Sequence, residues 1–269
     1  MTPVEVVQGT SPVILGFPHT GTYMPEEMWS RLNEEGRKLR DTDWHVDVLY
    51  RDLLPNATSV RATFHRYVID ANRDPSGQSL YPGQNTTGLV PLSNFDGQPI
   101  WREGEEPDEA EIAARTAEFH RPYHTALKQE VARVKALNGI AVVYDCHSIR
   151  SRCPFLFDGT LPDFNIGTDN GRTCAPALEE AVVEICSAAE GFSHILNGRF
   201  RGGWTTRHYG RPAERVHAVQ MELAQATHLE SESEPFAYDA LKAERLRRHL
   251  KATLERLEQI ALAIGEERQ

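Results

Sequence analysis

The 269-residue sequence lacks several features that define large classes of protein. No apolar run approaches the roughly 18 residues that a membrane-spanning helix needs. The net charge of −10 means that the chain lacks the basic excess typical of nucleic-acid-binding proteins. It contains neither a G-x-x-x-x-G-K-S/T phosphate loop nor a G-x-G-x-x-G motif after its first apolar stretch. We therefore expect no membrane partner, no nucleic-acid partner and no nucleotide chemistry.

Cysteine is also scarce, and its spacing argues against common structural uses. The four cysteines form no C-x-x-C pair, so a structural zinc ribbon is not indicated. Residues 1–12 contain no basic segment followed by an apolar core, so we expect no secretory signal. Without export the thiols stay reduced, and the sequence predicts a cytoplasmic protein. A serine hydrolase of the α/β type is not indicated either, because no G-x-S-x-G motif is present.

Apolar stretches that predict strands alternate with amphipathic stretches that predict helices. The predicted strands cover residues 12–18, 57–63, 65–70, 139–145 and 215–223. The predicted helices cover residues 25–40, 43–54, 107–137, 175–191 and 236–267, with Pro122 at a break or in the first turn of a second helix. This alternation predicts a single-domain α/β fold with a mixed, mostly parallel sheet flanked by helices. Ligands of such sheets bind where the strands end at their carboxyl edge.

Two histidines stand at such predicted strand ends. The apolar run "VILGF" is followed by His19, and "AVVY" is followed by Asp145, Cys146 and His147. Neutral imidazole is the commonest metal ligand, and catalytic zinc takes three protein ligands and a water. The alternative is that each histidine is a hydrogen-bonded residue with a purely structural role.

A third metal ligand can come from the segment "DTDWHVDVLY". It offers Asp41, Asp43, His45 and Asp47, and the pattern alone does not choose among them. One of the first two aspartates can instead cap the helix predicted to follow, by accepting backbone N–H groups.

The segment "HRYVIDANRDP" places Arg66, Asp70, Asn72 and Arg73 close together. Arginine binds a carboxylate in a planar, bidentate manner, and asparagine offers both a donor and an acceptor. The segment therefore predicts a site for an anionic ligand. The alternative is a salt-bridged turn before Pro75.

Glu222 interrupts an apolar run that predicts a buried strand. A buried glutamate is either paired with a structural partner or held in a site with a raised pKa, as a general base requires. Two long loops, 71–106 and 196–214, are rich in turn residues and are expected to be functional. The second contains Arg201 and Arg207, a local basic excess that suits an anionic ligand in an acidic protein.

Taken together, these motifs resemble the N-formylglutamate deformylase (N-formylglutamate amidohydrolase) family. The resemblance is carried, in order between residues 11 and 230, by "FPHTGTYMP", "DTDWHVDVLY", "HRYVIDANRDPSG", "YDCHSIRS", "DFNIGTDNGRTC", "GGWTTRHYGRP" and "QMELAQATHL". It implies a metal-dependent hydrolase of linear amides that cleaves N-formyl-L-glutamate to L-glutamate and formate, a reaction of histidine catabolism. It also implies one amidohydrolase domain over residues 1–269, with active-site loops near 71–106 and 196–214.

More distantly, the chain is similar to zinc carboxypeptidases and aspartoacylases, which implies a zinc-exopeptidase-like (phosphorylase/hydrolase-like) fold. By this resemblance the metal ligands are His19, Asp43 and His147, and the catalytic residues are Glu222 and Arg73. The implied substrate-binding residues are Arg66, Asn72, Arg73, Arg201 and Arg207. The chain departs from the H-x-x-E pattern of the zinc exopeptidases, since Thr22 occupies the acidic position. Asp43 is therefore preferred as the carboxylate ligand, with Asp41 and then Glu26 as alternatives.

Several questions stay open at this level. Zn²⁺ is the expected metal, but histidine and carboxylate ligands also suit other divalent transition metals. The alternatives for function are a zinc amidohydrolase acting on another N-acyl amino acid, and a non-catalytic binding protein for acidic amino acids. No pattern indicates the oligomeric state.

Overall fold

The computed structural model describes residues 2–78 and 83–266, and within these ranges seven strands form one sheet. The strands are β1 (Val4–Val7), β2 (Val13–Phe17), β3 (Thr58–Ala62), β4 (Ala141–Ile149), β5 (Phe164–Gly167), β6 (His194–Leu196) and β7 (Val216–Ala224). Their order in the sheet is β1-β3-β2-β4-β7-β5-β6. The neighbouring strands β3, β2, β4 and β7 are parallel, whereas β1 is antiparallel to β3 and β5 to β7. The predicted mixed, mostly parallel sheet is confirmed.

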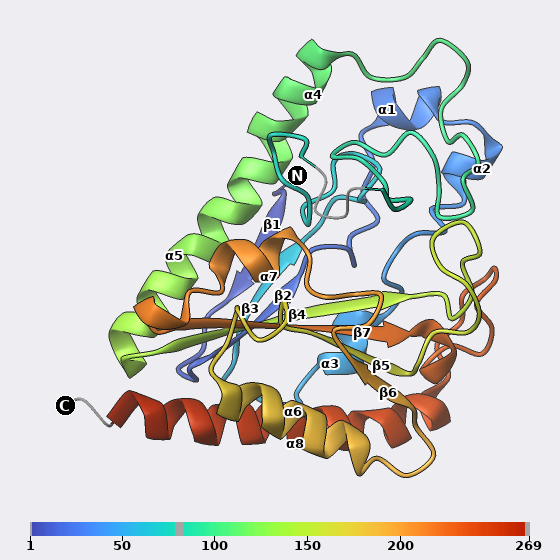
Figure 1. The fold of residues 1–269 in the computed structure, drawn as a ribbon. Coiled ribbons are helices and arrows are strands. Elements are labelled where there is room, and N and C mark those ends of the chain that lie inside the picture. The colour runs from blue at the N-terminus through green and yellow to red at the C-terminus, as the bar shows by residue number, and fades with distance from the viewer. Residues whose placement is uncertain (1, 79–82, 267–269) are drawn as a thin grey trace.

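Helices cover both faces of this sheet (Figure 1). The helices are α1 (Glu26–Arg31), α2 (Glu34–Arg37), α3 (Val46–Tyr50), α4 (Glu109–Arg115), α5 (Arg121–Asn138), α6 (Pro176–Ser187), α7 (Trp204–Tyr209) and α8 (Ala240–Glu266). Below the sheet in Figure 1 lie α6 and α8, and on the opposite side lies α5. Short 3-10 turns cover Pro212–Glu214 and Gln225–Thr227. None of the helices in the described part of the chain combines the length and the apolar character needed to cross a membrane.

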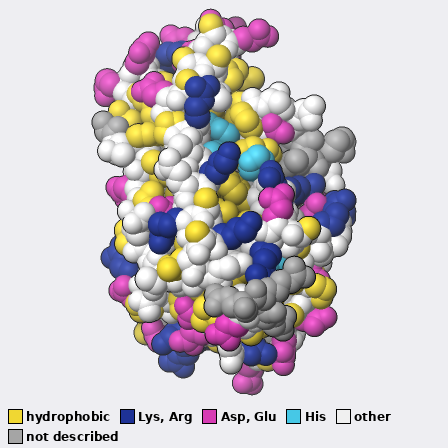
Figure 2. All heavy atoms as spheres, turned by 90° about the vertical axis from the view of Figure 1, so that its left-hand side faces the viewer, with side chains coloured by type: hydrophobic (Ala, Val, Ile, Leu, Met, Phe, Trp, Pro, Cys, Tyr) yellow, Lys and Arg dark blue, Asp and Glu magenta, His cyan; other side chains and the backbone are white. Residues whose placement is uncertain are grey.

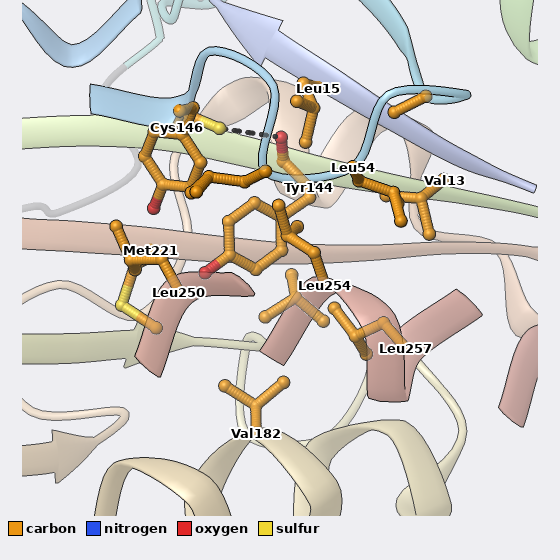
Figure 3. Close-up of a cluster of buried hydrophobic side chains, with 14 of the residues drawn as sticks. Val13, Leu15, Leu54, Tyr144, Cys146, Val182, Met221, Leu250, Leu254 and Leu257 are labelled. Atoms are coloured by element: carbon orange, nitrogen blue, oxygen red, sulfur yellow. Dashed lines mark hydrogen bonds between the residues drawn. The ribbon is translucent and has the colours of Figure 1, made fainter. Parts of the chain in front are cut away.

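The central strands are buried on both faces, because a hydrophobic cluster lies on each side of the sheet. Every residue of β4 is buried. Figure 3 shows the cluster under the sheet, where Tyr144 of β4 meets Leu250 and Leu254 of α8 and Val182 of α6 is nearby. Alternate residues of β4 belong to the opposite cluster, as the period of two in a strand requires.

That alternation corrects the prediction for the strand around His147. The strand was expected to end near residue 145, but β4 continues to Ile149 and pairs with β7 over its whole length. Cys146 remains in the lower core, while Asp145 and His147 point to the other face. Polar residues at every second position therefore mark a functional face of the strand, and not its end.

The strand predicted over residues 65–70 is wrong. Its apolar residues are buried, but the segment turns, with the Val68 N–H bonded to the His65 carbonyl at 2.9 Å. The strands β1, β5 and β6 were not predicted, and each has at most four residues.

The predicted helix 107–137 is built from α4, a π-helical turn over Thr116–His120, and α5. Pro122 lies in the first turn of α5, where its missing N–H is tolerated after the wider turn. The loop predicted over 196–214 contains α7. Residues 79–82 of the other long loop, and residue 267 of the last predicted helix, lie outside the described residues.

The packing under the sheet can be tested with a matched pair of leucines in α8. Leu254 is 0% exposed and Leu241 is 83% exposed. Leu254→Ala is expected to lower the free energy of unfolding by about 2–5 kcal/mol, because it leaves a cavity in the core. Leu241→Ala should change it by no more than about 0.5 kcal/mol. Urea denaturation of both variants checks this, and equal losses for the two would contradict the described orientation of α8.

Candidate active site

Four segments of the chain bring their polar side chains together near the carboxyl end of the parallel strands. His19 follows β2, and the N–H of Asp43 bonds to the His19 carbonyl at 3.0 Å. His147 lies within β4, paired in register with Glu222 of β7. Parallel pairing of β2, β4 and β7 thus places residues that are far apart in sequence at one location.

The imidazoles of His19 and His147 and the carboxylate of Asp43 form a compact, buried cluster. The two Nδ1 atoms are 3.2 Å apart. Asp43 Oδ2 lies 3.2 Å from Nδ1 of His147 and 3.6 Å from Nδ1 of His19. Ligand atoms bound tetrahedrally at roughly 2.0–2.1 Å from a metal are about 3.3 Å from one another. The donor set and its spacing therefore fit a small divalent metal ion.

The other ring nitrogens of both histidines contact carboxylates. Nε2 of His19 is 2.7 Å from Oδ1 of Asp70, and Nε2 of His147 is 3.1 Å from Oδ2 of Asp145. Metal-binding histidines usually donate their second N–H to such a partner, which fixes the tautomer and the ring orientation. With Nε2 donating, each Nδ1 presents a lone pair toward the other and toward Asp43, an arrangement that a cation between them would stabilise.

Negative charge is concentrated around this cluster. Burial raises the pKa of the Asp43 carboxyl, but His19, His147 and Arg66 outweigh burial and hold it well below its usual range. Burial lowers the pKa of His147, yet Asp145, Asp43 and Glu222 raise it well above the ordinary value. A group of buried carboxylates stabilises positive charge at their centre, whether it is a proton or a metal ion.

Glu222 of β7 lies on the same face of the sheet as His147. Burial raises the pKa of its carboxyl to about 7, against the lowering effect of His147. Nε2 of Gln220 donates to Oε2 of Glu222 at 3.0 Å, and the Gly203 N–H donates to Oε1 of Gln220 at 2.6 Å. The carboxylate is therefore held in a defined orientation.

Gly203 also allows the start of α7 to approach Asn72 closely. A Cβ at this position would lie 2.3 Å from Nδ2 of Asn72, so no side chain fits. The N–H of Thr205 donates to Oδ1 of Asn72 at 2.8 Å. The amide of Asn72 is thereby fixed beside Nε2 of His147, at 3.2 Å.

Two further histidines hold the backbone on either side of Asn72. Nε2 of His120 contacts the Arg73 carbonyl at 3.0 Å, and Nε2 of His124 contacts the Ala71 carbonyl at 2.7 Å. His120 ends the π-helical turn, and His124 lies in the first turns of α5. Figure 2 shows this side of the molecule, where histidine and basic side chains gather near a hollow.

The cluster opens into a pocket that is open in part to solvent. The structure brings six of the predicted residues to its lining: His19, Arg66, Asn72, Arg73, His147 and Glu222. Nη2 of Arg66 lies 2.7 Å from Nδ1 of His19 and 3.2 Å from Oδ2 of Asp70. Nη2 of Arg73 donates to Oγ1 of Thr87 at 3.0 Å.

The structure does not bring Arg201 and Arg207 to this pocket. Arg201 is exposed and donates to the Gly198 carbonyl at 3.3 Å. Arg207 donates to the Gly202 carbonyl at 2.9 Å and lies 3.4 Å from Asp169. Arg199, in the same loop, lines the pocket instead.

Among the aspartates that the sequence left open, Asp43 is the one in the cluster. Asp41 accepts the Tyr67 O–H at 2.8 Å and the Phe95 N–H at 3.0 Å. Burial raises its pKa to about 6. Asp41 therefore links the loops that contain Tyr67 and Phe95. Glu26 opens α1 on the surface.

Asp70, Asp145 and Gln220 are site residues whose roles the sequence reasoning missed. A signal was present for two of them: Asp145 and Gln220 are each two residues before His147 and Glu222, on the same face of their strands. Nothing in the sequence distinguished Arg199 from Arg201, because the path of an irregular loop has no periodic pattern.

Comparison with known proteins identifies the family. Residues 11–229 match the model of the N-formylglutamate amidohydrolase family. The N-formylglutamate deformylase of Pseudomonas aeruginosa is 48% identical over 263 residues, covering 97% of this chain and 96% of that protein. That of Pseudomonas putida is 46% identical over 264 residues, with the same coverage. The crystal structure of N-formylglutamate amidohydrolase from Ralstonia eutropha JMP134 superimposes with a TM-score of 0.76 at 27% identity, covering 99% of this chain and 98% of that one. The chain belongs to the N-formylglutamate amidohydrolase family.

Proposed function

We propose that this chain is an N-formylglutamate deformylase, which hydrolyses N-formyl-L-glutamate to L-glutamate and formate. The observation that carries the proposal is one pocket lined by the two clustered histidines, a buried glutamate and arginines. Two relatives named N-formylglutamate deformylase, 46% and 48% identical over 97% of the chain, support the choice of substrate.

His19, Asp43 and His147 would hold the metal, for which we propose Zn²⁺. The ion supplies Lewis acidity when bound, which makes water more acidic and polarises an amide carbonyl. Asp70 and Asp145 orient the two imidazoles through their Nε2 atoms. The chain itself thus fixes both the ligands and their protonation states.

Glu222 acts as the general base and then as the general acid. It takes a proton from the attacking water while the water oxygen bonds to the formyl carbon. It then gives that proton to the leaving glutamate nitrogen as the C–N bond breaks. Such proton transfer is worth typically ~10²–10⁴-fold in rate. The bond from Gln220 keeps the carboxylate in place for both steps.

The arginines bind the negative charges of the reaction. Arg66, whose Nη2 is 2.7 Å from Nδ1 of His19, is placed to stabilise the charge that develops on the formyl oxygen. Arg73 with Asn72 binds a substrate carboxylate, since both line the pocket beside the cluster.

We also propose that the whole chain works as one amidohydrolase domain, because the site draws residues from β2 to β7 of a single sheet. Its four cysteines are buried free thiols, which suits the reducing environment of the cytoplasm.

The metal ligand can be tested with two isosteric substitutions. Asp43→Asn should bind zinc much more weakly, because it replaces a carboxylate that contacts both Nδ1 atoms. Asp41→Asn should keep its metal, since Asp41 contacts Tyr67 and Phe95 instead. The measurement is zinc per chain after dialysis against a weak chelator. Equal retention by both variants would remove Asp43 from the metal site.

Glu222→Gln tests the general base. The variant should keep its zinc, while kcat for N-formyl-L-glutamate falls roughly 10²–10⁴-fold because the amide cannot accept the proton. Formate release measured alongside the zinc content checks both expectations. Full turnover by Glu222→Gln would exclude this residue as the base.

Arg73→Ala tests the carboxylate site. Truncating one partner of a hydrogen-bonded charge pair that the bound substrate buries typically costs about 2–5 kcal/mol, so kcat/KM for N-formyl-L-glutamate should fall at least about 30-fold. The matched control is Arg61→Ala, which removes an outer ion pair to Glu5 on the surface and should leave kcat/KM unchanged. Unchanged kinetics for Arg73→Ala would show that this residue does not bind the substrate.

A further inference from the structure

Arg199 lies where three loop segments of the chain meet. Its Nε donates to the Leu156 carbonyl at 3.0 Å, and its Nη2 donates to the Asn85 carbonyl at 3.1 Å. Asn85 in turn donates to the Phe155 carbonyl at 2.8 Å. Both acceptors of these two arginine bonds are neutral backbone carbonyls. These two bonds orient the guanidinium at the pocket.

The wall of the pocket beside Arg199 is apolar. Ile149, Leu156 and Phe200 line the pocket together with Arg199. All three belong to a small hydrophobic cluster under the loops, which keeps this wall in place. The Cζ atom of Arg199 lies 5.4 Å from the centre of the Phe200 ring. An apolar wall that ends in a fixed cation suits a short aliphatic arm with a terminal anion.

Three arginines line the pocket, and Arg199 differs from Arg66 and Arg73 in its contacts. Arg73 is close to the catalytic cluster, since its Nη1 lies 3.6 Å from Oδ2 of Asp70, which contacts His19. Arg199 is bonded instead to the Leu156 and Asn85 carbonyls of the loops. In N-formylglutamate the α-carboxylate is attached to the carbon next to the amide nitrogen, whereas the side-chain carboxylate lies two methylene groups further away. Arg73, which contacts the cluster through Asp70, suits the first, and Arg199, which is held by the loops beside the apolar wall, suits the second.

We propose that Arg199 is the specificity-determining residue of this pocket and binds the side-chain carboxylate of the substrate. This assignment rests on the proposed function and names the substrate class: N-formyl amino acids with a second, terminal carboxylate. Arginine can bind that carboxylate through two parallel hydrogen bonds, which gives orientation as well as affinity.

The test compares two nearly isosteric substrates, N-formyl-L-glutamate and N-formyl-L-glutamine, with the wild type and Arg199→Gln. The substitution should lower kcat/KM for N-formyl-L-glutamate by about 10²–10³-fold, because a charged hydrogen-bonded pair is lost. For N-formyl-L-glutamine, kcat/KM should change by less than about threefold. Arg199→Lys should recover part of the preference for N-formyl-L-glutamate over N-formyl-L-glutamine, because lysine keeps the positive charge but lacks the planar guanidinium. The ratio of the two substrates in one sample does not depend on the fraction of folded enzyme.

Arg152→Gln is the matched control. Arg152 is exposed on a neighbouring loop, where it donates to Oγ1 of Thr160 at 3.0 Å, so its loss should leave the substrate ratio unchanged. If Arg199→Gln loses activity equally on both substrates, or loses none, the assignment of Arg199 is overturned. The proposed function still stands in that case, provided that the wild type hydrolyses N-formyl-L-glutamate. A metal-loaded wild type that fails to hydrolyse N-formyl-L-glutamate would overturn the proposed function, and this inference with it.

Discussion

The structure depends on the compensation of charge among buried groups at one end of a parallel sheet. Two imidazole nitrogens and a carboxylate oxygen lie within 3.2–3.6 Å of one another, away from solvent. Such groups are costly to bury unless a cation lies among them or protons bind to them. Asp70 and Asp145 hold the outer nitrogens, so both inner nitrogens face Asp43, and Nη2 of Arg66 lies 2.7 Å from the inner nitrogen of His19. The surrounding strands and loops serve to keep this arrangement in place.

The sheet and the loops make separate contributions to the site. The parallel strands fix the reacting groups, because the register of β4 against β7 sets His147 beside Glu222. The loops add the surface on which a substrate is recognised. Gly203 links the two, since its N–H holds Gln220 and its lack of a side chain admits Asn72. A rigid core can thus determine the reaction while the loops determine which amide is accepted.

The sequence made much of the sheet and the centre of the site predictable, for a physical reason. Buried parallel strands are apolar throughout, so β2 and the start of β4 stood out, and the histidines beside them pointed to the sheet edge. The prediction of a strand over residues 65–70 was wrong because these apolar residues are buried in a turn. A buried turn and a buried strand give the same run of apolar residues in the sequence. The choice of Asp43 needed the resemblance to a family, since spacing alone did not separate it from Asp41. The loop arginines could not be ranked, because the path past Gly198 and Gly202 depends on contacts with distant loops.

The most direct test of the account is a metal titration of the chelator-treated chain, with formate release from N-formyl-L-glutamate as the readout. The account predicts no release by the metal-free chain and a linear recovery that stops at one zinc ion per chain, since the described residues contain one such ligand cluster. Formate release that persists after complete removal of metal, or recovery that does not saturate at one ion per chain, would contradict it.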